Sequence, residues 1–182
     1  TREKDSYPSL AQRAELANKN GADLFISIHC NWLSRPDYHG TETYVMGLHK
    51  SEANFEVAKR ENSVITMVEN AQDEYDNFDP ASPESYMLFS LYQSAYRNNS
   101  LLMAQNVENQ FRTRVGRKSR GVKEAGFWVL YKTAMPSVLI ETGYLSNAKE
   151  ERDLNDPLQQ TYIASGIFRA FRDYKKDLES LN

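Results

Sequence analysis

The stretch Leu24–Asn31, which reads LFISIHCN, constrains the fold of this 182-residue chain more than any other. It is a short apolar run that ends in polar residues, and such runs are typical of strands buried on both faces in parallel α/β sheets. Ligands in these sheets bind beyond the carboxyl ends of the strands, where His29 would lie. Ser137–Glu141 (SVLIE) has the same design and ends in a glutamate. The two strands therefore predict a site that combines an imidazole with a carboxylate.

Each of these two residues also has a structural interpretation. A single histidine at a strand end is more often hydrogen-bonded packing than a ligand. For Glu141 the two interpretations are balanced, because a buried carboxylate without a cationic partner is costly. Cys30 is the single cysteine, so an internal disulfide is excluded, and we expect a buried thiol. His29 cannot act as its base, since neighbours on a strand point to opposite faces.

Helix and strand signals alternate along the chain. A capping box at Ser9–Gln12 begins a helix that stops at Asn20-Gly21. Thr41–Met46 alternates like a strand, and Phe127–Leu130 is predicted to be another. Asp156, followed by proline and Gln159, opens a last helix. Its apolar face would carry Ile163, Ile167, Ala170, Tyr174 and Leu178. This order predicts an α/β fold, a layered α/β/α domain around a mostly parallel sheet.

The middle of the chain has weaker signals. Ser51–Glu74 has helical character, and the prolines of Asp76–Ser85 end it. Two apolar stripes follow, and the step between them at Arg97–Ser100 predicts a kink or two separate helices. The stripes are Leu88, Leu91 and Ala95, and then Leu101, Ala104, Phe111 and Val115. Gly116–Gly121 (GRKSRG) is a basic turn, which we interpret as a solvated loop.

The overall charge excludes some partners. With 22 basic and 25 acidic residues the net charge is -3, which favours neither nucleic acid nor an anionic membrane as a partner. No apolar run approaches the roughly 20 residues of a membrane-spanning helix. The composition, 40% hydrophobic and 26% charged, is that of one soluble globular domain.

Several phrases resemble the zinc-dependent N-acetylmuramoyl-L-alanine amidases, a family of cell-wall hydrolases of the type three amidase class. The matching phrases hold the family's order and spacing across nearly the whole chain. They are Thr1-Arg2 with Asp5, Leu10–Arg13 with Ala17-Asn18, Ala22–Asn31, Gly40–Tyr44, Gly121–Lys123 and Pro136–Asn147. The resemblance implies zinc as the cofactor, with His29 as a metal ligand and Glu141 as the catalytic glutamate.

The resemblance also implies the reaction, which is hydrolysis of the amide between N-acetylmuramic acid and L-alanine of the peptidoglycan stem peptide. The family's other two metal ligands would lie upstream of Thr1. We therefore expect residues 1–182 to be the carboxyl-terminal part of an amidase catalytic domain that lacks its first strand or strands. With one ligand of three, this chain alone is expected to be inactive.

Residues 59–99 resemble the insert of family members that act in cell separation. There, a helix covers the zinc site and keeps the enzyme off until an activator protein binds the insert. We expect Glu61 to occupy the open coordination position of the metal. The alternative is that the segment is a solvent-exposed helical addition without a regulatory role.

Two other functions stay open. A metal-deficient, catalytically silent wall-binding or regulatory module would also account for the absent ligands. An unrelated α/β domain would hold His29 and Glu141 for structural reasons. The resemblance alone implies a periplasmic or extracellular location at the cell wall.

Overall fold

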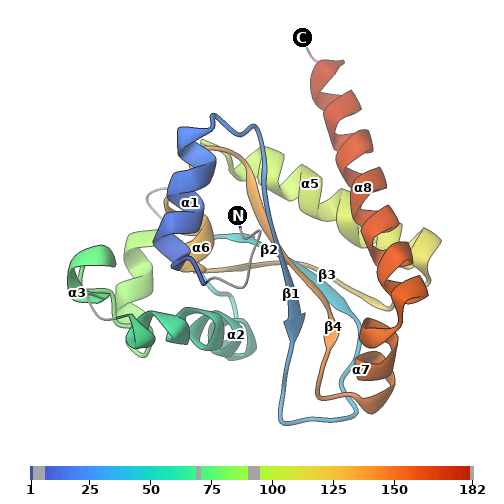
Figure 1. The fold of residues 1–182 in the computed structure, drawn as a ribbon, viewed down its shortest axis with the longest axis horizontal. Helices are drawn as coiled ribbons and strands as arrows, with labels where there is room; N and C mark the ends of the chain where they lie inside the picture. Colours follow the sequence, from blue (N-terminus) through green and yellow to red (C-terminus); the bar gives the residue numbers. More distant parts are fainter. Residues whose placement is uncertain (2–6, 69–70, 90–94, 181–182) are drawn as a thin grey trace. The chain divides into compact units, whose positions relative to one another are not determined.

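The computed structural model describes residues 1, 7–68, 71–89 and 95–180, which fold into two compact units (Figure 1). The first unit comprises Thr1–Phe25, Val45–Arg97 and Glu124–Ser137. The second unit comprises Ile26–Tyr44, Asn98–Lys123 and Val138–Asn182.

A four-stranded sheet carries most of the second unit. The strand order is β1 (Phe25–Asn31), β4 (Ser137–Tyr144), β2 (Thr41–Met46) and β3 (Ser119–Ala125). The β1–β4 and β2–β3 pairs are parallel, because the backbone hydrogen bonds at both ends of each pair advance in the same direction. Among the strands of the described residues, β2 and β4 form the antiparallel pair. The prediction of an α/β fold with a mostly parallel sheet is confirmed.

Four helical segments complete the second unit: α5 (Arg97–Gln110), the π-helical turn η3 (Phe111–Val115), α7 (Ala148–Asn155) and α8 (Pro157–Glu179). The predicted cap of α8 is confirmed, since the Asp156 side chain accepts a hydrogen bond from the Gln159 amide. Its apolar face packs against η3 and α7. The buried residues of that face are Ile163, Gly166, Ile167, Ala170 and Tyr174.

The first unit is helical. Its segments are α1 (Leu10–Lys19), α2 (Glu52–Asn62), η1 (Ser63–Met67), α3 (Ala71–Glu74), η2 (Pro83–Leu88) and α6 (Trp128–Tyr131). The predicted capping box of α1 is present, and α1 packs on α6. Aromatic rings meet edge-to-face or tilted around Trp128 at centroid distances of 5.0 to 5.6 Å, which is the geometry that aromatic pairs favour. These rings belong to Tyr75, Phe78, Phe89 and Tyr131.

Two sequence predictions of local structure were wrong. Phe127–Leu130 is not a strand: Phe127 is the N-cap of α6 and the other three residues lie in that helix. A short apolar run does not distinguish a buried strand from a buried helix. The side-chain oxygen of Asn62 accepts a hydrogen bond from the Trp128 amide at 2.9 Å and satisfies the first turn of that helix. The GRKSRG segment is not wholly a turn, since β3 begins at Ser119.

The environment of β1 also differs from the prediction. β1 is not buried on both faces, because Ile28 and Cys30 on one face are exposed while Phe25, Ser27 and Asn31 on the other are buried. Ile28 is 60% exposed, and Cys30 is exposed, so the expectation of a buried thiol was wrong. By contrast, all eight residues of β4 are buried, as predicted for a central strand.

α5 begins at Arg97, so Arg97–Ser100, where a kink or a break between helices was predicted, form the first turn of one helix. Leu91, from the first stripe, lies outside the described residues. In that described part of the chain, no helix is both long enough and apolar enough to cross a bilayer.

Candidate active site

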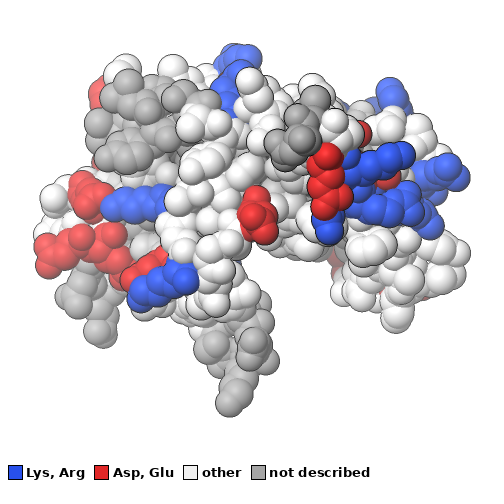
Figure 2. Space-filling model, turned by 90° about the horizontal axis from the view of Figure 1, so that it is seen from above, with Lys and Arg blue, Asp and Glu red and all other residues white. Residues whose placement is uncertain are grey.

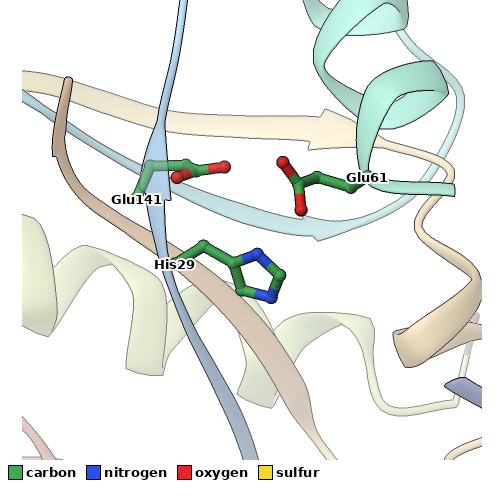
Figure 3. Close-up of side chains that lie close together, drawn as sticks. All are labelled: His29, Glu61 and Glu141. Carbon is green, nitrogen blue, oxygen red and sulfur yellow. The ribbon is translucent and has the colours of Figure 1, made fainter. Parts of the chain in front are cut away.

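His29 and Glu141 come together in the second unit. They lie on the neighbouring parallel strands β1 and β4, and their side chains point to the same side of the sheet (Figure 3). A ring nitrogen of His29 and a carboxylate oxygen of Glu141 lie within 4.8 Å of each other. Glu141 does not end its strand as predicted, since β4 continues to Tyr144.

The imidazole is oriented from its own strand. The Ser27 hydroxyl lies 2.9 Å from Nε2 of His29. The two side chains share a face because they are two residues apart on a strand. Cys30 lies on the opposite face, where its sulfur is 3.5 Å from the hydroxyl of Thr142. His29 therefore does not face Cys30, as the strand periodicity predicted.

A second carboxylate lies beside Glu141 and was missed by the sequence analysis. Glu42 is directly opposite Glu141 in the antiparallel β2–β4 register, and the two are 1% and 0% exposed. Opposed residues in an antiparallel pair share a face with their Cβ atoms about 4.5–5.5 Å apart. Lys123 of β3 donates to one oxygen of Glu42 at 2.5 Å, and the Tyr44 hydroxyl donates to the other at 2.6 Å. Lys123 thus balances the charge of Glu42.

The phenols beside Glu42 are held in their neutral form. Burial raises the pKa of Tyr44 far above its usual range, and the adjacent charge of Glu42 adds to the effect. Burial and Glu42 raise the pKa of Tyr144 in the same way. Both residues therefore act as hydrogen-bond donors at physiological pH. Glu42 and Tyr44 share a face because they are two residues apart on β2, and only the β2–β4 register brings that face to Glu141.

The other face of the sheet holds a structural carboxylate. Glu108 of α5 accepts hydrogen bonds from the hydroxyls of Thr41, Thr43 and Ser119 at 2.6 to 3.0 Å. Burial raises the pKa of Glu108, and the three hydroxyls oppose that rise. The group ties α5 to β2 and β3.

Glu61, the expected regulatory residue, belongs to the first unit and is the third side chain labelled in Figure 3. It lies near the end of α2, is 21% exposed, and pairs with Arg60 at 3.3 Å. Parts of the expected insert, residues 69–70 and 90–94, lie outside the described residues, as do Arg2 and Asp5 from the matching phrases.

The surface in Figure 2 carries both signs of charge. Lys and Arg side chains gather at the right of that view, with Asp and Glu side chains next to them. On this face acidic side chains lie directly beside the basic group.

The fold and this pair of side chains define an α/β domain with an imidazole and a carboxylate on one face of its sheet. The chain belongs to the Amidase_3 family, described as N-acetylmuramoyl-L-alanine amidase, whose model matches residues 1–173.

Named relatives agree with this assignment. AmiA of Escherichia coli K12, an N-acetylmuramoyl-L-alanine amidase, is 29% identical over 177 residues, which are 96% of this chain and 59% of AmiA. LytC of Bacillus subtilis 168, also named as such an amidase, is 28% identical over 92% of this chain and 24% of its own. The chain therefore spans less than two thirds of these curated relatives.

Solved structures show the same fold. An N-acetylmuramoyl-L-alanine amidase from Clostridium difficile 630 superposes with a TM-score of 0.67 at 25% identity, covering 97% of this chain and 70% of that one. The catalytic domain of CwlV from Bacillus (Paenibacillus) polymyxa var. colistinus gives 0.64 at 27% identity, with 96% and 70% covered.

Proposed function

We propose that this chain is part of the catalytic domain of a zinc-dependent amidase. The reaction is hydrolysis of the amide between N-acetylmuramic acid and the L-alanine of the peptidoglycan stem. One observation supports the proposal most strongly: in a chain of the N-acetylmuramoyl-L-alanine amidase family, a ring nitrogen of His29 and a carboxylate oxygen of Glu141 lie within 4.8 Å of each other. The proposed place of action is the cell wall, in the periplasm or outside the cell.

The donor set fits zinc. An imidazole and carboxylates are ordinary zinc ligands, and catalytic zinc sites use three protein ligands. His29 is the ligand that this chain would supply, and Ser27 at its Nε2 orients the ring. Zinc, when bound, supplies a Lewis acid that makes water nucleophilic near neutral pH.

Glu141 is the proposed general base and acid. Its carboxylate takes the proton of the attacking water and delivers it to the leaving amine of L-alanine. Complete burial fixes the carboxylate on the sheet face beside His29, which favours one productive orientation over many. The Glu42–Lys123 pair next to it keeps the local charge balanced.

The test is Glu141→Gln in the full-length protein that contains this chain. The amide is nearly isosteric but cannot accept the proton, so zinc content should stay unchanged while release of peptide from muramyl-peptide substrate falls by roughly a hundred- to ten-thousandfold. Glu15→Gln, an exposed glutamate on α1, is the matched control and should keep full activity. Equal rates in both variants would make Glu141 structural. No hydrolysis by the unaltered protein would favour a silent wall-binding module instead.

We further propose that residues 59–99 regulate the enzyme, as in members that act in cell separation. Glu61 lies in the last turn of α2 and has a partly exposed carboxylate. A carboxylate readily occupies an open coordination position of a metal. A hundredfold reduction in activity needs only about 2.7 kcal/mol of preference for the closed state. An activator protein that binds the open insert could supply that free energy.

Glu61→Ala tests this regulation. Without an activator, basal dye release from labelled peptidoglycan should rise. The rise is up to about a hundredfold if Glu61 at the metal position accounts for all the inhibition. Glu56→Ala, another α2 glutamate that is 53% exposed, is the matched control and should leave the basal rate unchanged. A basal rate that stays the same in both variants would mean that α2 does not inhibit the enzyme.

A further inference from the structure

A polar groove of about 530 Å³ lies in the second unit, beside the basic GRKSRG segment. Its walls come from the loop before β2, the residues after η3, the start of α7 and the first turn of α8. Nothing in the reaction described above uses this groove. Most of its lining side chains are charged or carry amides, so its natural occupant is a polar molecule.

The groove carries an excess positive charge. Arg117 and Lys149 line it and pair with two lining carboxylates, Glu150 at 2.8 Å and Asp153 at 2.7 Å. Within each of these two pairs the positive and the negative charge cancel. Lys118, which is exposed in the groove wall, adds one further positive charge. A negatively charged group is therefore attracted to the groove.

The wall of the groove also retains a hydrogen-bond donor. The side chain of Arg117 is 8% exposed, and its Nε has no hydrogen-bond partner among the described residues. Glu150 is already engaged, because its oxygens accept from the amides of Gly40 and Tyr144 at 2.9 and 2.8 Å. An unsatisfied buried donor is costly, so an acceptor brought by a ligand would stabilise it.

Two residues of the groove wall, Arg117 and Glu150, lie beside β4 on the face that carries Glu141. Gly143 of β4 follows Glu141 by two positions, about 7 Å along the strand, and shares its face. A Cβ built on Gly143 would lie 2.5 Å from Nη2 of Arg117 and 3.4 Å from Oε2 of Glu150. An extended peptide advances about 3.3–3.6 Å per residue. A peptide that follows β4 from a first amide at Glu141 would therefore bring its third residue beside Arg117.

We propose that this groove is a subsite for a carboxylate of the stem peptide, with Lys118 as its exposed cation and Arg117 as the buried donor. The proposal rests on the proposed function, because it takes the scissile amide to lie at Glu141. It assigns to the GRKSRG segment a role in choosing substrates whose peptide ends in a free acid.

The experiment compares two probes on the full-length protein: an N-acetylmuramoyl tripeptide with a free carboxyl terminus, and the same molecule as its terminal amide. Calorimetry gives the Kd of each probe. Lys118→Met should weaken binding of the free acid about three- to fivefold, as for an exposed ion pair, and change that of the amide less than twofold. Lys176→Met, an exposed lysine of α8 outside the groove, is the matched control and should affect neither probe.

The two proposals fail in different ways. Equal effects of Lys118→Met on both probes, no effect on either, or no binding of either probe would overturn the subsite. Binding that discriminates between the probes in a protein that hydrolyses neither would support the subsite and contradict the amidase. KM and kcat give a second measurement, because loss of the subsite should raise KM for the free acid and leave kcat unchanged.

Discussion

Glu42 is the residue on which the face around Glu141 depends. It is 1% exposed, and Lys123 is the cation that pairs with it. Lys123→Met would leave a buried carboxylate without its counter-charge, so the free energy of unfolding should fall by about 3 kcal/mol. Urea denaturation measures this change. Lys50→Met is the control, since Lys50 is 72% exposed in its pair with Glu124 and should cost less than about 1 kcal/mol.

Glu108 makes stability depend on pH in a direction opposite to most carboxylates. Burial raises its pKa, so the folded protein holds the proton more tightly than the unfolded chain does. Its contribution to stability is fully present below the pKa of an unfolded glutamate and is lost as the pH rises through the raised, folded pKa. Glu108→Gln should remove this part of the pH dependence. Urea unfolding over a pH series tests it, and identical slopes for both proteins would contradict the assignment.

At the scale of elements, the start of β2 depends on Gly40. Its φ is 117°, and a Cβ there would collide with the carbonyl oxygen of Lys118, at the start of the β2–β3 pairing. Gly40→Ala should lower the free energy of unfolding by about 3 kcal/mol or more. Gly21→Ala is the control: its φ is also positive, at 57°, but its Cβ would meet nothing within 4 Å, so a cost of about 1 kcal/mol is expected. Equal losses of stability for the two variants in thermal melts would show that the backbone moves to relieve the collision at residue 40.

At the scale of the whole molecule, the expected insert is not separable from the rest of the first unit. Tyr75, Tyr86 and Phe89 fall within residues 59–99 and are buried in the aromatic core around Trp128. Replacing residues 59–99 by a short Gly-Ser loop should therefore lower the melting temperature, because burial of these rings dominates the core of this unit. Circular dichroism melts measure it. An unchanged melting temperature would mean that the insert is an independent decoration, and single substitutions at Glu61 remain the sharper test of regulation.

The sequence by itself determined the elements that have local signals. The capping box at Ser9 and the cap at Asp156 act within one helical turn, so they specify α1 and α8 without help from the rest of the chain. Thr41–Met46 is the strand that its alternation predicted. His29 and Glu141 were found because each lies on an apolar strand and in a phrase that resembles a known family.

Only the tertiary structure decided which faces meet. The antiparallel register that sets Glu42 against Glu141 and the helical form of Trp128–Tyr131 both depend on contacts between residues far apart in the chain. Local propensity carries no information about such pairings, because strand register and burial are fixed by packing and by hydrogen bonds between elements. The groove at Arg117 is of the same kind, since four separate segments build it.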